Sequence, residues 1–235
     1  FILSISVFYL SFFGYETTRF NDIIKSEIKK NNKDIVLDFK KISLLLDAKK
    51  LTLFVKFINP NINYKNITIP LRSLRSDIDL EPLLKKKIGI KRLVISTNYL
   101  DYNEIKSLIN EKDFDKKTLN KLTKGEFKIN NLEINFDDDL NIKDNFIIKG
   151  EVKNINIKLT NDHDIKNLVF NFNFEKNIVD FQNASWSLHG FNKKEVNFIG
   201  SELSVKQKNK DYKIILNFKT KQIGNLFKIP VMNFL

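Results

Sequence analysis

The chain has 235 residues, of which 42% are hydrophobic, so it is long enough to bury a large apolar core. Only 7 Gly and 4 Pro are present, fewer than a compact all-β domain with many tight turns needs, which favours an extended sheet. The formal charge of +12 is compatible with an anionic partner, although Lys is scattered through every segment, and the absence of Cys excludes disulfides and thiolate metal sites.

The first segment, 1–15, is apolar and uncharged and is followed by Glu16. Fifteen helical residues reach only about 22 Å, whereas a helix needs roughly 20 residues to span a bilayer core. Residues are therefore expected to be missing upstream. The residues before Glu16 are bulky and aromatic, unlike the small residues of a signal-peptide cleavage site. We therefore predict a truncated, uncleaved membrane anchor at 1–15.

The next segment has helical periodicity, and after it the apolar period changes to two. The predicted helix ends near Asn31, and its apolar stripe recurs at spacings of three and four. The stripe is Phe20, Ile23, Ile24 and Ile28, with Thr17 or Thr18 as the cap. The strands predicted next are 35–39, 42–46, 51–57 and 67–69, with a hairpin turn at 47–50 and Pro70 after the last strand.

Helical patterns return before the middle of the chain. Pro82 suits the first turn of a short helix, and 90–95 is a predicted strand. Asp101 followed by Glu104 is typical of a capping box, which predicts a helix from there. Residues 111–124 are highly charged and are predicted to be an exposed insertion.

From Gly125 to the end, apolar residues alternate with Asn, Lys, Glu, Ser or Asp. This pattern predicts a meander of antiparallel strands with one dry and one wet face. Phe170, Phe172 and Phe174, for example, are expected on one face. Turns are predicted at 137–139, 161–162, 175–177, 189–190 and 209–211. The expected domains are the anchor 1–15, a helix and strand region 16–110, the insertion 111–124 and the meander 125–235.

Residues that could carry chemistry are few. The two histidines, His163 and His189, fall in separate predicted turns, and Ser187 near His189 has no orienting carboxylate or oxyanion hole beside it in the sequence. The acidic run 137–139 lacks the ligand spacing of a calcium-binding loop. The Lys clusters are short, and the aromatic residues alternate into the apolar face. We therefore predict no enzyme activity, no catalytic residues, no metal, no cofactor and no nucleic-acid partner.

The order of the anchor, the helix at 20–25 and the strand pair within 35–57 is followed by the stretch 76–84 and by a strand at 88–96 that contains Ile-x-x-Leu-x-Ile. This arrangement, over about the first 110 residues, resembles the AsmA-like family of Gram-negative envelope proteins (the AsmA, TamB and YhdP group). In that family the stretch that corresponds to 76–84 is a short helix, which leads into the strand that corresponds to 88–96. Members often carry Pro soon after it, where this chain has 98–100, Asn-Tyr-Leu.

The resemblance implies the fold class: mainly β with a few helices (α+β), with an elongated, curved antiparallel sheet that forms a groove after an N-terminal membrane helix. It also implies a bacterial inner-membrane protein with a periplasmic body that carries phospholipids toward the outer membrane, with other envelope proteins as candidate partners. A dry groove suits this role, because moving a lipid tail into water costs about 0.8 kcal/mol per CH₂. The residues expected to line the groove are Leu53, Val55, Phe57, Ile134, Phe136, Ile157, Phe170, Phe172, Phe174, Phe198, Leu216 and Phe218.

Two alternatives stay open at this point. The same apolar residues could pack the core of an ordinary β-sandwich. The protein could also be an anchored scaffold for envelope assembly that carries no lipid. An apolar face that stays open distinguishes the lipid carrier from both alternatives.

Overall fold

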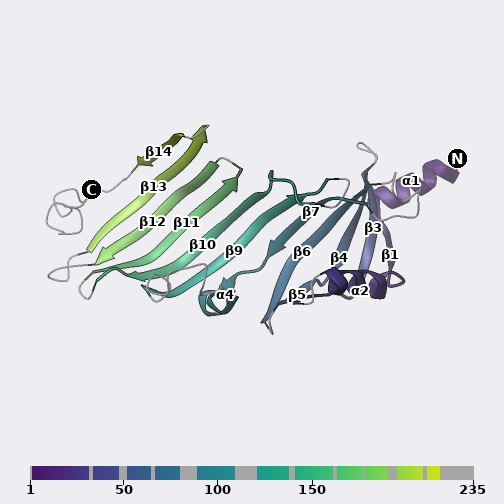
Figure 1. Ribbon diagram of the computed structural model, residues 1–235, viewed down its shortest axis with the longest axis horizontal. Helices are drawn as coiled ribbons and strands as arrows, with labels where there is room; N and C mark the ends of the chain where they lie inside the picture. Colours follow the sequence, from purple (N-terminus) through teal and green to yellow (C-terminus); the bar gives the residue numbers. More distant parts are fainter. Residues whose placement is uncertain are drawn as a thin grey trace. The chain divides into compact units, whose positions relative to one another are not determined.

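In the computed structural model the chain is mainly β, and hydrogen bonding joins its strands into one antiparallel sheet that is not closed (Figure 1). The described residues are 2–31, 34–47, 52–64, 67–79, 89–108, 121–137, 141–160, 163–176, 178–189, 195–208 and 211–217. The main path of the sheet is β1-β3-β4-β6-β7-β9-β10-β11-β12-β13-β14, with β2 paired to β5, β5 to β6, and β8 to β9.

The elements have the following bounds. The helices are α1 (Ile2–Phe12), α2 (Asn21–Asn31) and α4 (Tyr102–Leu108). The strands of the first half are β1 (Tyr15–Thr17), β2 (Ile35–Asp38), β3 (Lys41–Asp47), β4 (Thr52–Ile58), β5 (Asn61–Tyr64), β6 (Ile67–Asp79), β7 (Gly89–Thr97) and β8 (Leu100–Asp101). The remaining strands are β9 (Leu122–Asn135), β10 (Ile147–Lys158), β11 (Asp164–Glu175), β12 (Ile178–His189), β13 (Glu195–Lys208) and β14 (Asp211–Asn217).

The chain divides into two compact units, and β9 contributes to both. The first unit comprises residues 1–98 and 130–147, and the second comprises 99–129 and 148–235. The predicted boundaries at 110 and 125 stay a prediction. Residues 122–124, at the end of the predicted charged insertion, belong to β9, whereas 109–120 lie outside the described residues.

The N-terminal helix is shorter than predicted. α1 has 11 residues and is therefore about 16 Å long, roughly half the thickness of a hydrocarbon core. Within the described part of the chain, no helix has both the length and the apolar character needed to span a membrane. The predicted membrane-spanning helix is not supported. Tyr15, assigned to it from the sequence, instead begins β1 and pairs with Leu44 of β3.

The amphipathic helix is confirmed as α2, but it begins at Asn21, after both predicted caps. Thr17 lies in β1, where its Oγ1 accepts a hydrogen bond from the backbone N–H of Arg19 at 3.1 Å. The backbone N–H of Asn21 donates to the carbonyl of Thr18 at 3.0 Å. Both threonines therefore stabilise the turn between β1 and the helix, because β1 ends at Thr17 and a turn follows before the helix begins.

The strand β6 extends beyond the short strand predicted at 67–69. It continues through Pro70, which pairs with Asn61 of β5, to Asp79. Farther along, Leu74 pairs with Phe57 of β4. Pro70 thus lies near the point where β6 changes partner, where its missing N–H interrupts no continuous ladder. The helix predicted around Pro82 falls outside the described residues.

In the second unit the predicted capped helix is confirmed as α4, and the predicted meander is confirmed over the described residues, which end at Asn217. The strands from β10 to β14 follow one another in sheet order. Glu175, His189 and Asp211, which were predicted in turns, are instead strand ends. The predicted turn residues 138–139, 161–162, 177, 190 and 209–210 lie outside the described residues.

At the start of α4, the backbone N–H of Asn103 donates to Asp101 Oδ1 at 2.8 Å. The backbone N–H of Asp101 donates to Glu104 Oε2 at 3.1 Å. These are the two reciprocal bonds of a capping box.

Irregularities in four neighbouring strands keep the apolar residues of the second unit on one face. Each of these strands carries one residue in the left-handed region: Asn154 (φ 55°) in β10, Asn167 (φ 53°) in β11, Asn183 (φ 55°) in β12 and Gly200 (φ 72°) in β13. The register shifts beside Asn167 and Asn183. A bulge adds one residue and moves the alternation by one step. In β12 the apolar residues therefore lie at odd positions before the bulge, such as Phe181, and at even positions after it, such as Trp186, and they stay on the same face.

Candidate functional site

The first unit carries an apolar face across five of its strands. One cross-strand row consists of Ile42, Phe57, Leu74, Ile95 and Leu132. The adjacent row consists of Leu44, Val55, Ser76, Leu93 and Ile134. Because side chains alternate along a strand, the residues between these rows belong to the opposite face. The predicted residues Val55, Phe57 and Ile134 therefore share one face.

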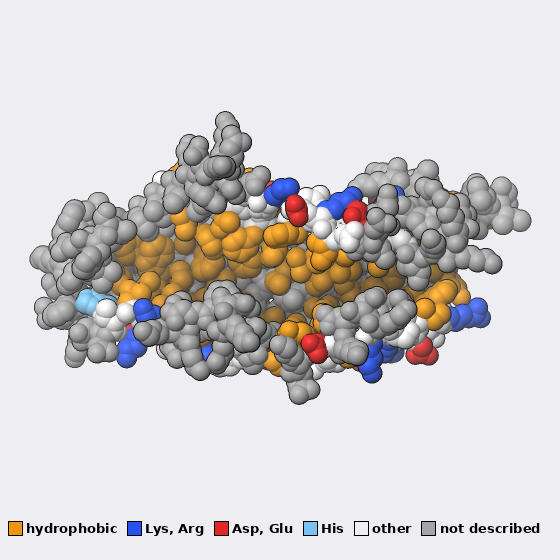
Figure 2. All heavy atoms as spheres, viewed as in Figure 1, with side chains coloured by type: hydrophobic (Ala, Val, Ile, Leu, Met, Phe, Trp, Pro, Cys, Tyr) orange, Lys and Arg blue, Asp and Glu red, His pale blue; other side chains and the backbone are white. Residues whose placement is uncertain are grey.

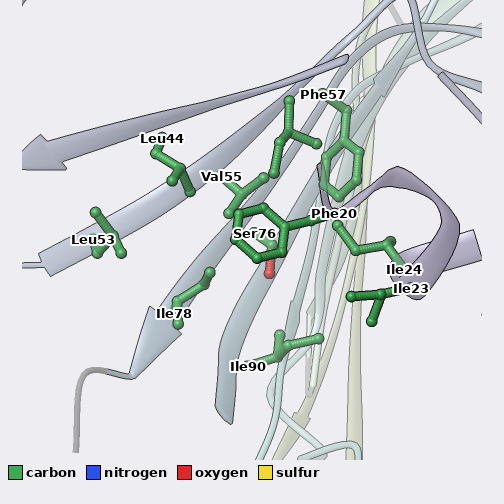
Figure 3. Close-up of a pocket in the computed structure, with 11 residues that line it drawn as sticks. Phe20, Ile23, Ile24, Leu44, Leu53, Val55, Phe57, Ser76, Ile78 and Ile90 are labelled. Atoms are coloured by element: carbon green, nitrogen blue, oxygen red, sulfur yellow. The ribbon is translucent and has the colours of Figure 1, made fainter. Parts of the chain in front are cut away.

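A cavity of about 270 Å³ lies between α2 and this face (Figure 3). Every described residue that lines it is apolar except Ser76. The lining consists of Phe20, Ile23 and Ile24 from the α2 region, Ile42 and Leu44 from β3, Leu53, Val55 and Phe57 from β4, Ser76 and Ile78 from β6, and Ile90 from β7. The volume is close to the lower end of the range for ligand pockets.

The cavity brings together three of the predicted groove residues and others that sequence reasoning missed. Leu53 is partly exposed, but Val55 and Phe57 are only 5% and 7% exposed, so these two also belong to the core. The ring of Phe39 meets Phe57 edge-on, with centroids 4.9 Å apart. The cavity-lining residues of the α2 region, which include Phe20, were recognisable in the sequence as an apolar stripe. The sequence did not indicate which face of which strand this stripe would cover.

The opposite face of the first unit carries charges. Asp77 is 6% exposed, and its carboxylate forms ion pairs with Arg75 Nε at 2.8 Å and with Arg92 Nη2 at 2.6 Å. Arg92 Nη1 also lies 3.5 Å from Glu133 Oε1. The guanidinium of Arg75 stacks over the ring of Phe54, 3.8 Å from its centroid. This ladder of ion pairs keeps one side of the sheet polar while the other side stays apolar.

In the second unit, four phenylalanines form an aromatic cluster on β11 and β12. The ring centroids of Phe172 and Phe174 are 5.3 Å apart, and those of Phe170 and Phe172 are 6.5 Å apart. Phe181 lies 5.3 Å from Phe170 and 5.7 Å from Phe174. All four side chains are partly exposed, so each ring keeps a surface that a ligand can reach.

Phe198 differs from these residues although its sequence pattern is the same. It is 2% exposed and stacks on Trp186 with a centroid distance of 4.7 Å and an interplanar angle of 13°. Leu188 belongs to the same buried cluster. Phe198 is therefore packed in a core and leaves almost no surface for a ligand.

The other predicted lining residues lie in several places. Ile134, Phe136 and Ile157 are partly exposed, and Phe136 forms an isolated bridge with Ile142. The backbone of Leu216 in β14 pairs with that of Leu203 in β13. Phe218 lies outside the described residues.

The position of Phe172 depends on a glycine in the neighbouring strand. A Cβ atom at Gly150 of β10 would lie 2.2 Å from Phe172 Cζ and 2.4 Å from the carbonyl oxygen of Lys128. Neither distance is compatible with a side chain, so the Phe172 ring lies over the backbone of β10. A glycine inside a strand pattern often indicates such a close approach, and it is the signal that sequence reasoning missed here.

The opposite face of the second unit carries a cluster around Glu151. Lys128 Nζ lies 2.8 Å from Glu151 Oε1, and Lys153 Nζ lies 3.7 Å from Oε2. The Lys153 ammonium is also 4.5 Å from the ring centroid of Tyr99. The hydrogen bond from Lys128, assisted by Tyr99 and by both lysine charges, holds the pKa of Glu151 below its ordinary value, although partial burial acts in the other direction.

This lowered pKa predicts a pH-dependent stability. Because the folded-state pKa of Glu151 is below the unfolded value, the stabilisation is present above the unfolded pKa and is lost as the pH falls through the folded pKa. Glu151→Gln should lower the free energy of unfolding at pH 7 by up to about 1 kcal/mol, and the difference from the wild type should vanish in acid. Urea titrations at several pH values measure this difference in the free energy of unfolding. A pH-independent difference, or one unchanged in a Lys128→Met background, would contradict this origin.

His163 and Ser187 have structural contacts. His163 is 5% exposed, and its Nδ1 lies 3.0 Å from Thr160 Oγ1 within the turn after β10. Ser187 Oγ donates to Asn197 Oδ1 at 2.7 Å. Among the described residues, no group of His, Asp or Glu is placed to hold a metal ion.

Figure 2 shows hydrophobic side chains gathered on the viewed face, with charged side chains along its borders. Comparison with protein-family models, curated proteins and solved structures finds no match to this chain. The two faces of the sheet and the cavity are therefore the features that bear on function.

Proposed function

We propose that this protein binds the acyl chains of phospholipids on the apolar face of its sheet and carries them toward the outer membrane. The observation that supports this most directly is the cavity between α2 and the sheet, whose described lining is apolar except for Ser76. In the second unit, the partly exposed rings of Phe170, Phe172, Phe174 and Phe181 supply a similar surface.

The energetic reason is the cost of exposing lipid tails to water. Each CH₂ that leaves the bilayer costs about 0.8 kcal/mol, so a tail of ordinary length needs an apolar surface along most of its path. A sheet with one apolar and one ion-paired face meets this need, because tails stay dry on the first while the second stays hydrated. The process requires no bond chemistry.

The resemblance to the AsmA-like family favours the same role and the same place. In this proposal the protein acts at the bacterial inner membrane with its sheet in the periplasm, and other envelope proteins are candidate partners. The main alternative is an envelope scaffold with a closed β-sandwich. A sandwich requires a second sheet against the apolar face, whereas all strands of the described residues belong to one sheet by hydrogen bonding.

Photo-crosslinking in cells tests the proposal. A photoreactive amino acid at position 172 should capture phospholipid, because the Phe172 ring is partly exposed on the apolar face. The matched control is position 173, since Asn173 is the next residue of the same strand and its Nδ2 donates to Glu175 on the other face at 3.2 Å. A folded protein that yields no lipid adduct from position 172 or from Leu53 in the cavity would refute lipid binding.

A further inference from the structure

Ser76 is the only polar residue in an otherwise apolar cross-strand row, where it lies between Val55 and Leu93. Its side chain is 5% exposed. Among the described residues, no group forms a hydrogen bond with its Oγ, which has less than 1 Å² of accessible surface. Leaving a buried hydroxyl without a partner costs about 1–3 kcal/mol, and native proteins rarely do so. Ser76 belongs to the lining of the cavity, so a ligand that reaches its hydroxyl there can supply the missing partner.

The chemistry of the lining restricts what that ligand can be. None of the described residues around the cavity is charged. A carboxylate or an ammonium group would therefore be buried without a counter-ion, which is costly. A neutral carbonyl oxygen accepts a hydrogen bond from a hydroxyl without this cost, and in an acyl ester it stands at the head of a hydrocarbon chain.

We infer that the cavity binds one acyl ester, with the hydrocarbon chain against the apolar lining and the ester carbonyl oxygen accepting a hydrogen bond from Ser76 Oγ. This inference rests on the proposed function and adds the chemical group that is recognised. It also gives the small side chain of Ser76 a role, because a leucine or isoleucine at this place in the row would occupy part of the cavity.

We expect Phe20 to control access to the hydroxyl. Figure 3 shows its ring in front of Ser76, among the residues that line the cavity. Phe20 is 45% exposed and precedes α2, so its ring can rotate outward without disturbing the core. We expect this rotation to accompany binding, because Ser76 Oγ has less than 1 Å² of accessible surface in the unliganded protein.

The test compares two probes that differ only in the ester group. Methyl laurate and dodecane compete with an apolar fluorescent dye for the full chain, and their affinities are measured in the wild type and in Ser76→Ala. A net hydrogen bond corresponds to a factor of about 2 to 12 in affinity. Ser76→Ala should therefore lower the affinity for methyl laurate by that factor and leave the affinity for dodecane unchanged. Laurate ion at pH 8 should bind the wild type more weakly than the ester, because no described lining residue is a cation.

Two controls separate recognition from folding. Ser76→Ala should be at least as stable as the wild type, since it removes a hydroxyl without a partner. Ser73→Ala should leave both affinities unchanged, because Ser73 lies on the opposite face of β6, 2.7 Å from the hydroxyl of Ser96. If dodecane binds and Ser76→Ala changes both probes equally or neither, the ester inference is wrong and the proposed function stands. If neither probe displaces the dye from the wild type, acyl-chain binding in this cavity is refuted as well.

Discussion

Replacing Phe198 with Ala should lower the free energy of unfolding of the second unit by about 3–5 kcal/mol. Phe198 is 2% exposed and stacks on Trp186, so truncation removes the ring contacts and leaves a cavity in the buried cluster beside β13. Trp186 is the only tryptophan in the chain, and its fluorescence therefore reports directly on this cluster during denaturant unfolding.

The matched control for this change is the next residue of the same strand. Ile199 is 70% exposed, and Ile199→Ala should change the free energy of unfolding by no more than about 0.5 kcal/mol. Equal effects of the two substitutions would contradict the assignment of Phe198 to a buried core, and would return it to the residues that could contact lipid.

Phe172→Glu should greatly slow the transfer of phospholipid while the protein stays folded. Phe172 is partly exposed, so a carboxylate at this position reaches water in the unliganded protein. With lipid bound, the same carboxylate lies among the tails without a counter-ion, and its desolvation costs several kcal/mol. We expect transfer of a fluorescent phospholipid between vesicles to fall about 100-fold or more.

Asn173→Lys is the control for a new charge on the same strand. Asn173 faces the polar side of the sheet, where a lysine stays hydrated, so transfer should remain at the wild-type rate. Circular dichroism verifies that both variants keep their strands. A folded Phe172→Glu protein that transfers lipid normally would show that the tails do not contact this face.

Local regularities in the sequence were enough to predict most of the elements. The alternation of apolar and polar residues predicts the strands of the meander, because the side-chain period of a strand is two whatever its partners are. Asp101 and Glu104 predict the start of α4, because a capping box is made by residues within one turn. The apolar stripe from Phe20 to Ile28 likewise predicts α2.

Several errors arose where one strand has more than one partner or where a helix competes with a strand. Pro70 is an ordinary strand terminator in the sequence, but β6 passes through it because the strand changes partner from β5 to β4. Tyr15 continues an apolar run, yet it forms a strand because β3 offers it an edge. These outcomes depend on pairing between distant segments, which local patterns do not contain.

Local sequence thus specifies which side chains alternate onto an apolar face, whereas the role of each side chain on that face depends on how the strands and the helix pack. Phe172 and Phe198 have the same pattern, but one lies over Gly150 with part of its ring exposed and the other is buried under Trp186. Ser76 was one polar residue among many until the register placed it between Val55 and Leu93. The physical reason is that burial and cavities are made by side chains from several strands and a helix, so they exist only once the register and the packing are set.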